Sequence, residues 1–449
     1  MHATAKVCDS LTQITFTSLP VDVIHAAKQV ILDGISVAVA GAKEPGPTIA
    51  AKHARRQCES GPATLFVQHS QTNASLAAYV NGISMHVLDY EPMWSPPTHA
   101  TSPTLPAILA LAQEQKSSGR DIITAFVRGC ELQGRLRLAS GQFAPGEFKV
   151  HPPGSVGPLG AAVACGHLLR LRPDELQHAL GIAASRAGGL MANVGTMAKA
   201  THCGWAAMSG LDAALLASDG FTANKDILEA PNGYIDRFYG KDFNYNSLSG
   251  LGESYRMVDP GFVMKLFPCQ YGTHFGISAA LEIHKMLDSP SRIQKIHIIA
   301  PIMPYVDRPK CETGLDGKFS FQYTVAAALL DGKVGIRTFD PASHRRRELT
   351  DLITRTTLEA DPNIPRVLEN MWVEVIATLQ GGKLIRARCD GPIGFWDRQP
   401  LEKTDHLGKV KECLGLHLTA EEVSLCIQHV DQLETLEAKE VSELMRLLS

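Results

Sequence analysis

The sequence predicts a mainly α-helical protein with a smaller α+β domain. Apolar stretches rich in Ala and Gly recur at helical spacing through the first part of the chain. Near Asp259-Pro260 this pattern gives way to β-branched segments with partial alternation. A length of 449 residues exceeds that of one typical core, so we expect two domains. We assign a helical domain to 1–266, an α+β domain to 267–396, and C-terminal helices that return to the helical domain to 397–449.

Several helices of the first region carry their own start and stop signals. The segment LPVDVIHAAKQVILDGISVAVAGA has Pro20 near its start and stops at Gly41. RPDELQHALGIAASRAGG places Pro173 in a first turn, and a later helix ends at Asp219-Gly220. Because small residues are frequent on these apolar helices, we expect a buried helical core or a large subunit interface.

The middle of the chain contains strand and hairpin patterns. SRIQKIHIIAPI predicts a strand, and MWVEVIATLQGGKLIRARC predicts a hairpin that turns at Gly381-Gly382. Between them, FSFQYTVAAALLDGK predicts a helix ending at Asp331-Gly332. The C-terminal segments LTAEEVSLCIQHV and LEAKEVSELMRLL again predict helices.

Composition excludes several classes of partner and location. The formal net charge is −3 with acids and bases mixed, which argues against nucleic acid or an anionic membrane as a partner. The chain has no apolar run of about eighteen residues, and its N-terminus is a poor secretory signal. The 10 cysteines are scattered without a C-x-x-C pair, which is typical of free thiols in a reducing compartment. We therefore expect a cytoplasmic protein.

Motifs of common enzyme classes are missing. Despite 17 histidines, the sequence has no H-E-x-x-H motif and no clustered His/Cys ligand set. Its glycine-rich pieces match neither the phosphate-binding loop nor the dinucleotide fingerprint, and there is no G-x-S-x-G motif. We therefore exclude a metallohydrolase, an NTPase, a dehydrogenase and an α/β-hydrolase, and we expect no metal and no cofactor.

One stretch, HVLDYEPMWSPPTHATSPTLP, combines titratable groups with a proline-rich loop. It leaves an apolar helix at His86 and re-enters one at LPAILALA, and it carries Asp89 and Glu91 just before its prolines and His99 among them. A stiff loop with an acid and an imidazole is where acid–base chemistry is often placed. The alternative is a simple helix connection with capping acids.

Other isolated polar residues lie in Gly/Pro-rich joints next to apolar helices or strands. Each alone is more often a cap or a surface residue, but free backbone N–H groups in such joints can bind anions. A pocket that gathers them would suit a polycarboxylate substrate. These residues are His151, Lys199, His202, Lys265, His274, Tyr305 and Arg308.

The ordered motifs HVLDYEPMWSPPTHATSPTLP, ELQGRLRLASG, VHPPGSVGPLGAA, GTMAKATHCGWAA, KLFPCQYGTH and PYVDRP resemble those of the MmgE/PrpD family. The resemblance covers nearly the whole chain. The family includes 2-methylcitrate dehydratases, cis-aconitate decarboxylases and iminodisuccinate epimerases. The resemblance implies a homodimer, a helical domain with an α+β lid, an active site between them, and no metal.

Position by position, the resemblance implies catalytic and substrate-binding residues and also shows departures. In cis-aconitate decarboxylases the opening loop looks like Asp-x-Asp-Asp-Thr-Trp. Here Glu91, Pro92 and Met93 replace the three central residues, and Gln270 stands where those enzymes have a further His. The implied catalytic residues are Asp89, His99, His151, Lys199, His274 and Tyr305. His202, Lys265 and Arg308 are expected to bind substrate.

The family reactions pass through a carbanion-like species beside a carboxylate, which needs a base, an acid and cationic donors. We assign carboxylate binding to Lys199 with His99 and His151. The base is His274 or Asp89, and the acid is Tyr305 or a protonated His.

The first hypothesis is a hydro-lyase that dehydrates 2-methylcitrate or a longer 2-alkylcitrate, because Pro92 and Met93 make one wall more apolar. Three alternatives remain open. The first is a cis-aconitate decarboxylase-like enzyme that forms itaconate or an analogue. The second is an epimerase or isomerase of a small dicarboxylate, and the third is a non-catalytic protein.

Overall fold

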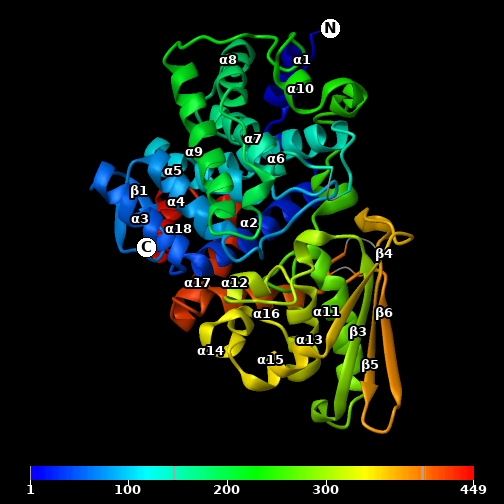
Figure 1. Ribbon diagram of the computed structural model, residues 1–449. Helices are drawn as coiled ribbons and strands as arrows, with labels where there is room; N and C mark the ends of the chain where they lie inside the picture. The colour runs from blue at the N-terminus through cyan, green and yellow to red at the C-terminus, as the bar shows by residue number, and fades with distance from the viewer. Residues whose placement is uncertain (1, 145–146, 396–398, 400) are drawn as a thin grey trace.

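A computed structural model describes residues 2–144, 147–395, 399 and 401–449 of the chain. It contains a large helical body and a smaller lid in which helices pack on a mixed sheet (Figure 1). The predicted fold class is therefore confirmed. The buried side chains form one extensive cluster in the body and a second cluster in the lid.

The body is built from helices, some joined by short turns and others by loops of about a dozen residues or more. A small antiparallel pair, β1 and β2, also lies here, and the sequence pattern did not indicate it. The elements are α1 (Ala3–Gln13), α2 (Val21–Gly41), α3 (Pro45–Gln57), β1 (Ala63–Leu65), β2 (Ser70–Thr72), α4 (Ala74–His86), α5 (Thr101–Gln115), α6 (Gly119–Ala139), α7 (Pro152–Leu168), α8 (Pro173–Ala184), α9 (Ala198–Ser218) and α10 (Tyr234–Phe238).

Small residues let the central helices approach closely. A Cβ added to Gly82 on α4 would lie 2.9 Å from the Cα of Gly204 on α9. A Cβ on Gly129 of α6 would lie 2.6 Å from the carbonyl oxygen of Gly160 on α7. Close packing of this kind is what the Ala- and Gly-rich sequence predicts, and it makes these helices a rigid base for the loops at their ends.

The lid holds a four-stranded sheet in the order β4-β3-β5-β6. Strands β3 and β4 pair in parallel, whereas β3 with β5 and β5 with β6 pair antiparallel. The predicted strand and hairpin are confirmed, with Gly381 and Gly382 at φ +88° and +83° in the turn. The lid elements are α11 (Tyr271–Lys285), β3 (Ile293–Pro301), α12 (Gly314–Gly317), α13 (Phe321–Asp331), α14 (Pro341–His344), α15 (Arg347–Thr354), β4 (Thr356–Asp361), β5 (Val373–Leu379) and β6 (Leu384–Cys389).

The last helices pack on the body, as Figure 1 shows for the red end of the chain beside the blue helices. They are α16 (Lys403–Leu414), α17 (Ala420–Asp431) and α18 (Ala438–Leu447). Val410, Val423 and Leu444 are buried in the same cluster as the core of the body. The expected domain boundary at residue 396 itself lies outside the described residues.

The loop after α4 is shorter than the sequence analysis expected. Helix α5 begins at Thr101, whereas the sequence pattern predicts a helix only from Leu105, so the prediction that Pro103 lies in the loop is wrong. Pro103 lies in the first turn, where no N–H is needed for an intrahelical bond. Pro106 is accommodated inside a helix that is buried over most of its length.

Helix α2 is, among the described residues, the segment long and apolar enough to cross a membrane by length and hydropathy, and 78% of its most apolar window is buried within the fold. This burial is that of a core helix. The cytoplasmic location and the homodimer stay predictions.

Candidate active site

A cavity lies where the body and the lid meet, and it contains about 680 Å³ of empty space including its mouth. The loop between α4 and α5 and the starts of α7 and α9 contribute to it from the body. The start of α11 and the turn after β3 contribute from the lid. Its lining comprises Asp89, Met93, Pro97, Thr98, His99, Phe148, His151, Pro152, Pro153, Met191, Val194, Lys199, Gln270, Tyr271, Tyr305, Phe319 and Leu368.

Asp89 is held by two ammonium groups. Its Oδ2 accepts a hydrogen bond from Lys199 at 2.8 Å, and its Oδ1 accepts one from Lys265 at 2.5 Å. Burial raises the pKa of Asp89, but the two lysines outweigh burial and hold the pKa well below its usual range. The backbone of Asp89 has φ +51°, so a left-handed turn directs this carboxylate. Asp89 is therefore an ionised, fixed acceptor.

Lys199 and His151 lie at the N-terminal ends of two body helices. Lys199 is the second residue of α9, and His151 caps the N-terminus of α7 ahead of Pro152. The Nδ1 atoms of His151 and His202 are 3.2 Å apart. Burial, and next the charge of Lys199, hold the pKa of His151 well below its usual range. His151 is thus a neutral imidazole beside a cation.

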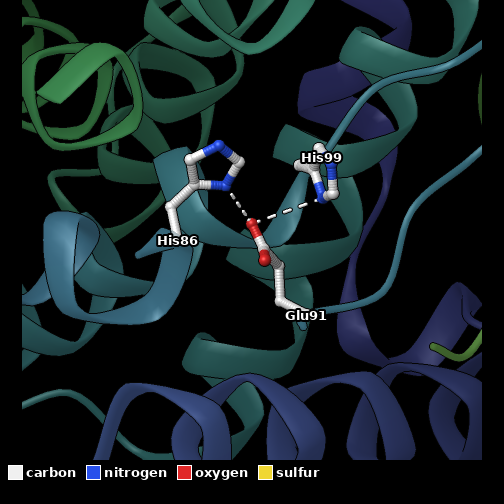
Figure 2. A group of neighbouring side chains, drawn as sticks. All are labelled: His86, Glu91 and His99. Carbon is white, nitrogen blue, oxygen red and sulfur yellow. Dashed lines mark hydrogen bonds and ion pairs between the residues drawn. The ribbon is translucent and has the colours of Figure 1, made fainter. Parts of the chain in front are cut away.

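His99 belongs to a buried group with His86 and Glu91, which Figure 2 shows. Oε1 of Glu91 is hydrogen-bonded to Nδ1 of His86, and it also accepts a hydrogen bond from Oγ of Ser102 at 2.9 Å. Nδ1 of His99 lies 3.3 Å from the same oxygen, while Nε2 of His99 lies 3.7 Å from Oδ1 of Asp89. His99 therefore lies between the two carboxylates of the loop, and its Nδ1 has no hydrogen-bond partner among the described residues.

The three ionisable groups of this cluster differ in charge. Burial lowers the pKa of His86, but Cys203 and Glu91 raise it to about 9. Burial raises the pKa of Glu91, yet His86 brings it well below its usual value. Burial lowers the pKa of His99 to about 3. At neutral pH the cluster is an ion pair of His86 and Glu91 beside a neutral His99.

Among the described residues, possible ligand atoms of His86, Glu91 and His99 lie within 4.8 Å of one another, close enough to hold a metal ion together. The hydrogen bond between Nδ1 of His86 and Glu91 needs a proton that a metal ion would displace. The charges and contacts fit a hydrogen-bonded cluster. The expectation of a metal-free site stays a prediction.

The lid side supplies a phenol, an amide and apolar groups. Nε2 of Gln270 donates to the hydroxyl of Tyr305 at 3.2 Å. Burial, and next Asp89, raise the pKa of Tyr305, so the hydroxyl keeps its proton. Met93 is fixed to the main chain of Val263 by hydrogen bonds of 3.0 and 2.7 Å. The cavity thus has a polar end and an apolar wall.

Four of the residues expected in the site lie outside the lining. Lys265 is fully buried behind Asp89, and His202 stands behind His151. His274 is fully buried, with Nε2 3.4 Å from the carbonyl oxygen of Cys269, and its ring packs on Phe267 and Tyr271. Arg308 lies over the ring of Phe319, 5.6 Å from its centroid. Asp89, His99, His151, Lys199 and Tyr305 line the cavity together.

Sequence reasoning missed the roles of His86 and Ser102, which both contact Glu91. A signal existed: His86 ends an apolar helix and stands five residues before Glu91, and Ser102 follows His99 closely. It also missed the apolar lining by Met191, Val194 and Leu368, because these lie in or next to single 3₁₀ turns, which have no periodic sequence pattern.

The charges around the cavity suit an anionic ligand. The carboxylates of Asp89 and Glu91 face three cationic groups, namely Lys199, Lys265 and the imidazolium of His86. The surplus positive charge lies in a buried setting, where it interacts more strongly with an anion than it would in water. Neutral imidazoles and a phenol add hydrogen-bonding groups that can exchange protons.

Family models and individual relatives of this chain point to the same protein family. The MmgE/PrpD N-terminal domain matches residues 5–246, and the MmgE/PrpD C-terminal domain matches residues 267–434. A cis-aconitate decarboxylase of Mus musculus is 32% identical over 439 residues, covering 95% of this chain and 89% of the relative. That of Homo sapiens is 31% identical, covering 92% and 88%. A cis-aconitate decarboxylase-like protein of Aspergillus oryzae is 26% identical, covering 100% and 97%. The chain belongs to the MmgE/PrpD family.

Proposed function

We propose that the protein is a lyase that releases carbon dioxide from cis-aconitate or a close tricarboxylate analogue. The observation that carries this proposal is the cavity in which Lys199, His99, His151 and Tyr305 surround the ionised Asp89. Relatives named as cis-aconitate decarboxylases support it, since they align along nearly the whole chain. Decarboxylation therefore ranks above the dehydration that the sequence first suggested.

Decarboxylation requires cations, hydrogen-bond donors and an acid in the site. The carbon–carbon bond to the departing carboxylate breaks, carbon dioxide leaves, and the electron pair stays on the remaining carbon framework next to a carboxylate. A proton then forms the new carbon–hydrogen bond. Cations must hold the substrate carboxylates, donors must stabilise the developing charge, and an acid must supply the proton.

We assign these tasks by position. Lys199 and the hydroxyl of Tyr305 reach the cavity from opposite domains and bind carboxylates of the substrate. His151 donates a hydrogen bond as a neutral imidazole, and His99 delivers the proton. Met93, Met191 and Leu368 exclude water from the reacting carbon.

The test is a direct comparison of substrates. Purified protein is incubated with cis-aconitate and, separately, with 2-methylcitrate, while carbon dioxide release is measured in the gas phase and product formation is followed by proton NMR. We expect one carbon dioxide per cis-aconitate consumed. Alkene formation from 2-methylcitrate, with no carbon dioxide from cis-aconitate, would contradict decarboxylation.

A second candidate is dehydration of a 2-alkylcitrate, and the position of Met93 favours it. Met93 lines the cavity where decarboxylases of the family carry Thr, whereas Pro92 is outside the lining. An apolar side chain there tolerates an alkyl substituent better than a further carboxylate. The variant Met93→Thr should raise kcat/KM for cis-aconitate relative to its 2-alkyl analogues by about tenfold, the size of effect that one or two apolar groups have in a pocket. An unchanged ratio would show that this wall does not select the substituent.

A further inference from the structure

We propose that His86 and Glu91 store the proton that His99 delivers to the reacting carbon. This inference rests on the proposed lyase function, because decarboxylation consumes one proton per turnover. His86 and Glu91 are positioning residues that act through His99, the member of the group that lines the cavity.

Geometry connects the three side chains in series. Nδ1 of His86 is hydrogen-bonded to Oε1 of Glu91, and Nδ1 of His99 lies 3.3 Å from the same oxygen. Figure 2 shows the carboxylate between the two rings, which come from the end of α4 and from the loop before α5. The far nitrogen of His99, Nε2, points toward Asp89 at 3.7 Å, on the cavity side. Nδ1 of His99 has no hydrogen-bond partner among the described residues, so the ring has to turn toward Oε1 of Glu91 before a proton can pass from His86 through this carboxylate.

Because His86 and Glu91 are buried, the proton that they share is shielded from solvent. The side chains of His86 and Glu91 are both 0% exposed, while that of His99 is 11% exposed. The pKa of His86 is about 9, so it holds its proton at neutral pH. The pKa of His99 is about 3, so it needs a second group to supply the proton that it passes on.

The proton that His99 loses is replaced from His86 through Glu91. His99 gives the proton on Nε2 to the carbon that lost carbon dioxide, while Glu91 passes a proton to Nδ1 of His99 and takes one from Nδ1 of His86. His86 is then neutral, Glu91 is unchanged and His99 carries its proton on Nδ1. After product leaves, Nε2 of His99 takes a proton from water in the open cavity, and the proton on Nδ1 returns through Glu91 to His86. One solvent proton is consumed per turnover.

Other charged or titratable groups around His86 are compatible with this role. The ring of His99 lies 4.9 Å away and that of His151 5.6 Å away, centroid to centroid. Cys203 and Glu91 favour the imidazolium, whereas Lys199 opposes it. His151 is neutral, so Glu91 is the carboxylate that compensates His86 directly.

Two substitutions test the store through activity. Glu91→Gln keeps the shape but cannot take up and pass on a proton, and His86→Gln removes the stored one. We expect each to lower kcat at least 100-fold while KM changes less than threefold, and to remove the fall in wild-type kcat that accompanies deprotonation of His86 near pH 9. The exposed Glu59→Gln and His25→Gln are matched controls. Wild-type kcat and pH profile in both buried variants would overturn the proposal.

A second measurement separates this proposal from the lyase function and from misfolding. Wild-type protein with ¹⁵N-labelled histidine is titrated by NMR, and the His86 signals are assigned with His86→Gln. The proposal predicts an imidazolium at His86 up to about pH 8 and a neutral His99 at pH 7. A neutral His86 at pH 7 would overturn the store whether or not any substrate is turned over. A charged His86 without decarboxylation of any tricarboxylate would contradict the lyase function alone.

Discussion

Asp89 shows how one residue organises the site. Its left-handed backbone turn follows the end of α4, and its two carboxylate oxygens each accept a hydrogen bond from a lysine of a distant segment. Lys199 belongs to the body, while Lys265 precedes the lid. A carboxylate fixed by two cations has its charge and its direction set before substrate arrives, which is the condition for efficient electrostatic stabilisation.

Replacing Lys199 should separate catalysis from folding. In Lys199→Met the partner Lys265 still compensates Asp89, so we expect a loss of only a few degrees in Tm. The substrate loses its cation in the cavity, and kcat/KM should fall by about 10²- to 10³-fold, as it does when one preorganised donor is removed. Steady-state kinetics and thermal melts measure both, with the exposed Lys52→Met as control. Near-normal kcat/KM would remove Lys199 from the site.

The ion pair of His86 and Glu91 predicts a specific pH dependence of stability. The pKa of His86 in the folded protein, about 9, exceeds its ordinary value of 6.5, so its contribution is fully present below pH 6.5 and is lost as pH rises through 9. The shift corresponds to on the order of 3 kcal/mol. Urea unfolding of wild type and His86→Gln at pH 6.5 and 9.5 checks this. Equal losses in both proteins over that range would contradict it.

The contribution of the buried carboxylates to folding stability is lost at low pH, whereas that of His86 is lost at high pH. The folded-state pKa values of Asp89 and Glu91 are both depressed, so their contribution is present above the unfolded values near 4 and is lost as pH falls further.

At the scale of elements, helix α16 connects α2 with the loop that carries Asp89. Lys409 on α16 donates to Oδ1 of Asp33 on α2 and to the carbonyl oxygen of Tyr90, both at 2.9 Å. His406 adds a contact of 3.2 Å to the other oxygen of Asp33. Because Tyr90 follows Asp89, this buried network fixes the loop from behind.

Breaking that network should cost stability as well as activity. Lys409→Ala leaves Asp33 buried with only His406, and loss of one partner of a buried pair typically costs about 3–5 kcal/mol. Denaturant unfolding should show this loss, and kcat should fall because the loop of Asp89 loosens. Lys411→Ala, exposed on the same helix, is the control. A difference below about 1 kcal/mol between the two variants would refute the clamp.

Elements with a strong local pattern were predictable, and those that depend on partners were not. The alternation of residues 373–379 and the turn at Gly381 define a hairpin by themselves. Strand β4 has one buried residue, Thr356, and becomes a strand because β3 offers it a parallel edge. Helix α5 begins four residues before Leu105, because the buried packing of its first turn outweighs its prolines.

At the scale of the molecule, the site lies where segments far apart in sequence converge. Lys199 and Tyr305 are separated by more than a hundred residues yet line one cavity. Residue type and loop context predicted that these groups act together. The sequence could not predict which of these side chains reach the cavity surface. Lys265 and His274 are buried behind the lining because of the way the lid packs.

The measurement that tests the central proposal most directly is mass spectrometry of the product formed from cis-aconitate in D₂O. Decarboxylation with proton delivery from the site predicts release of one carbon dioxide and a dicarboxylate product with one deuterium on carbon. A hydrated product with all three carboxylates, or exchange of deuterium into cis-aconitate without loss of carbon dioxide, would contradict the assignment as a decarboxylating lyase.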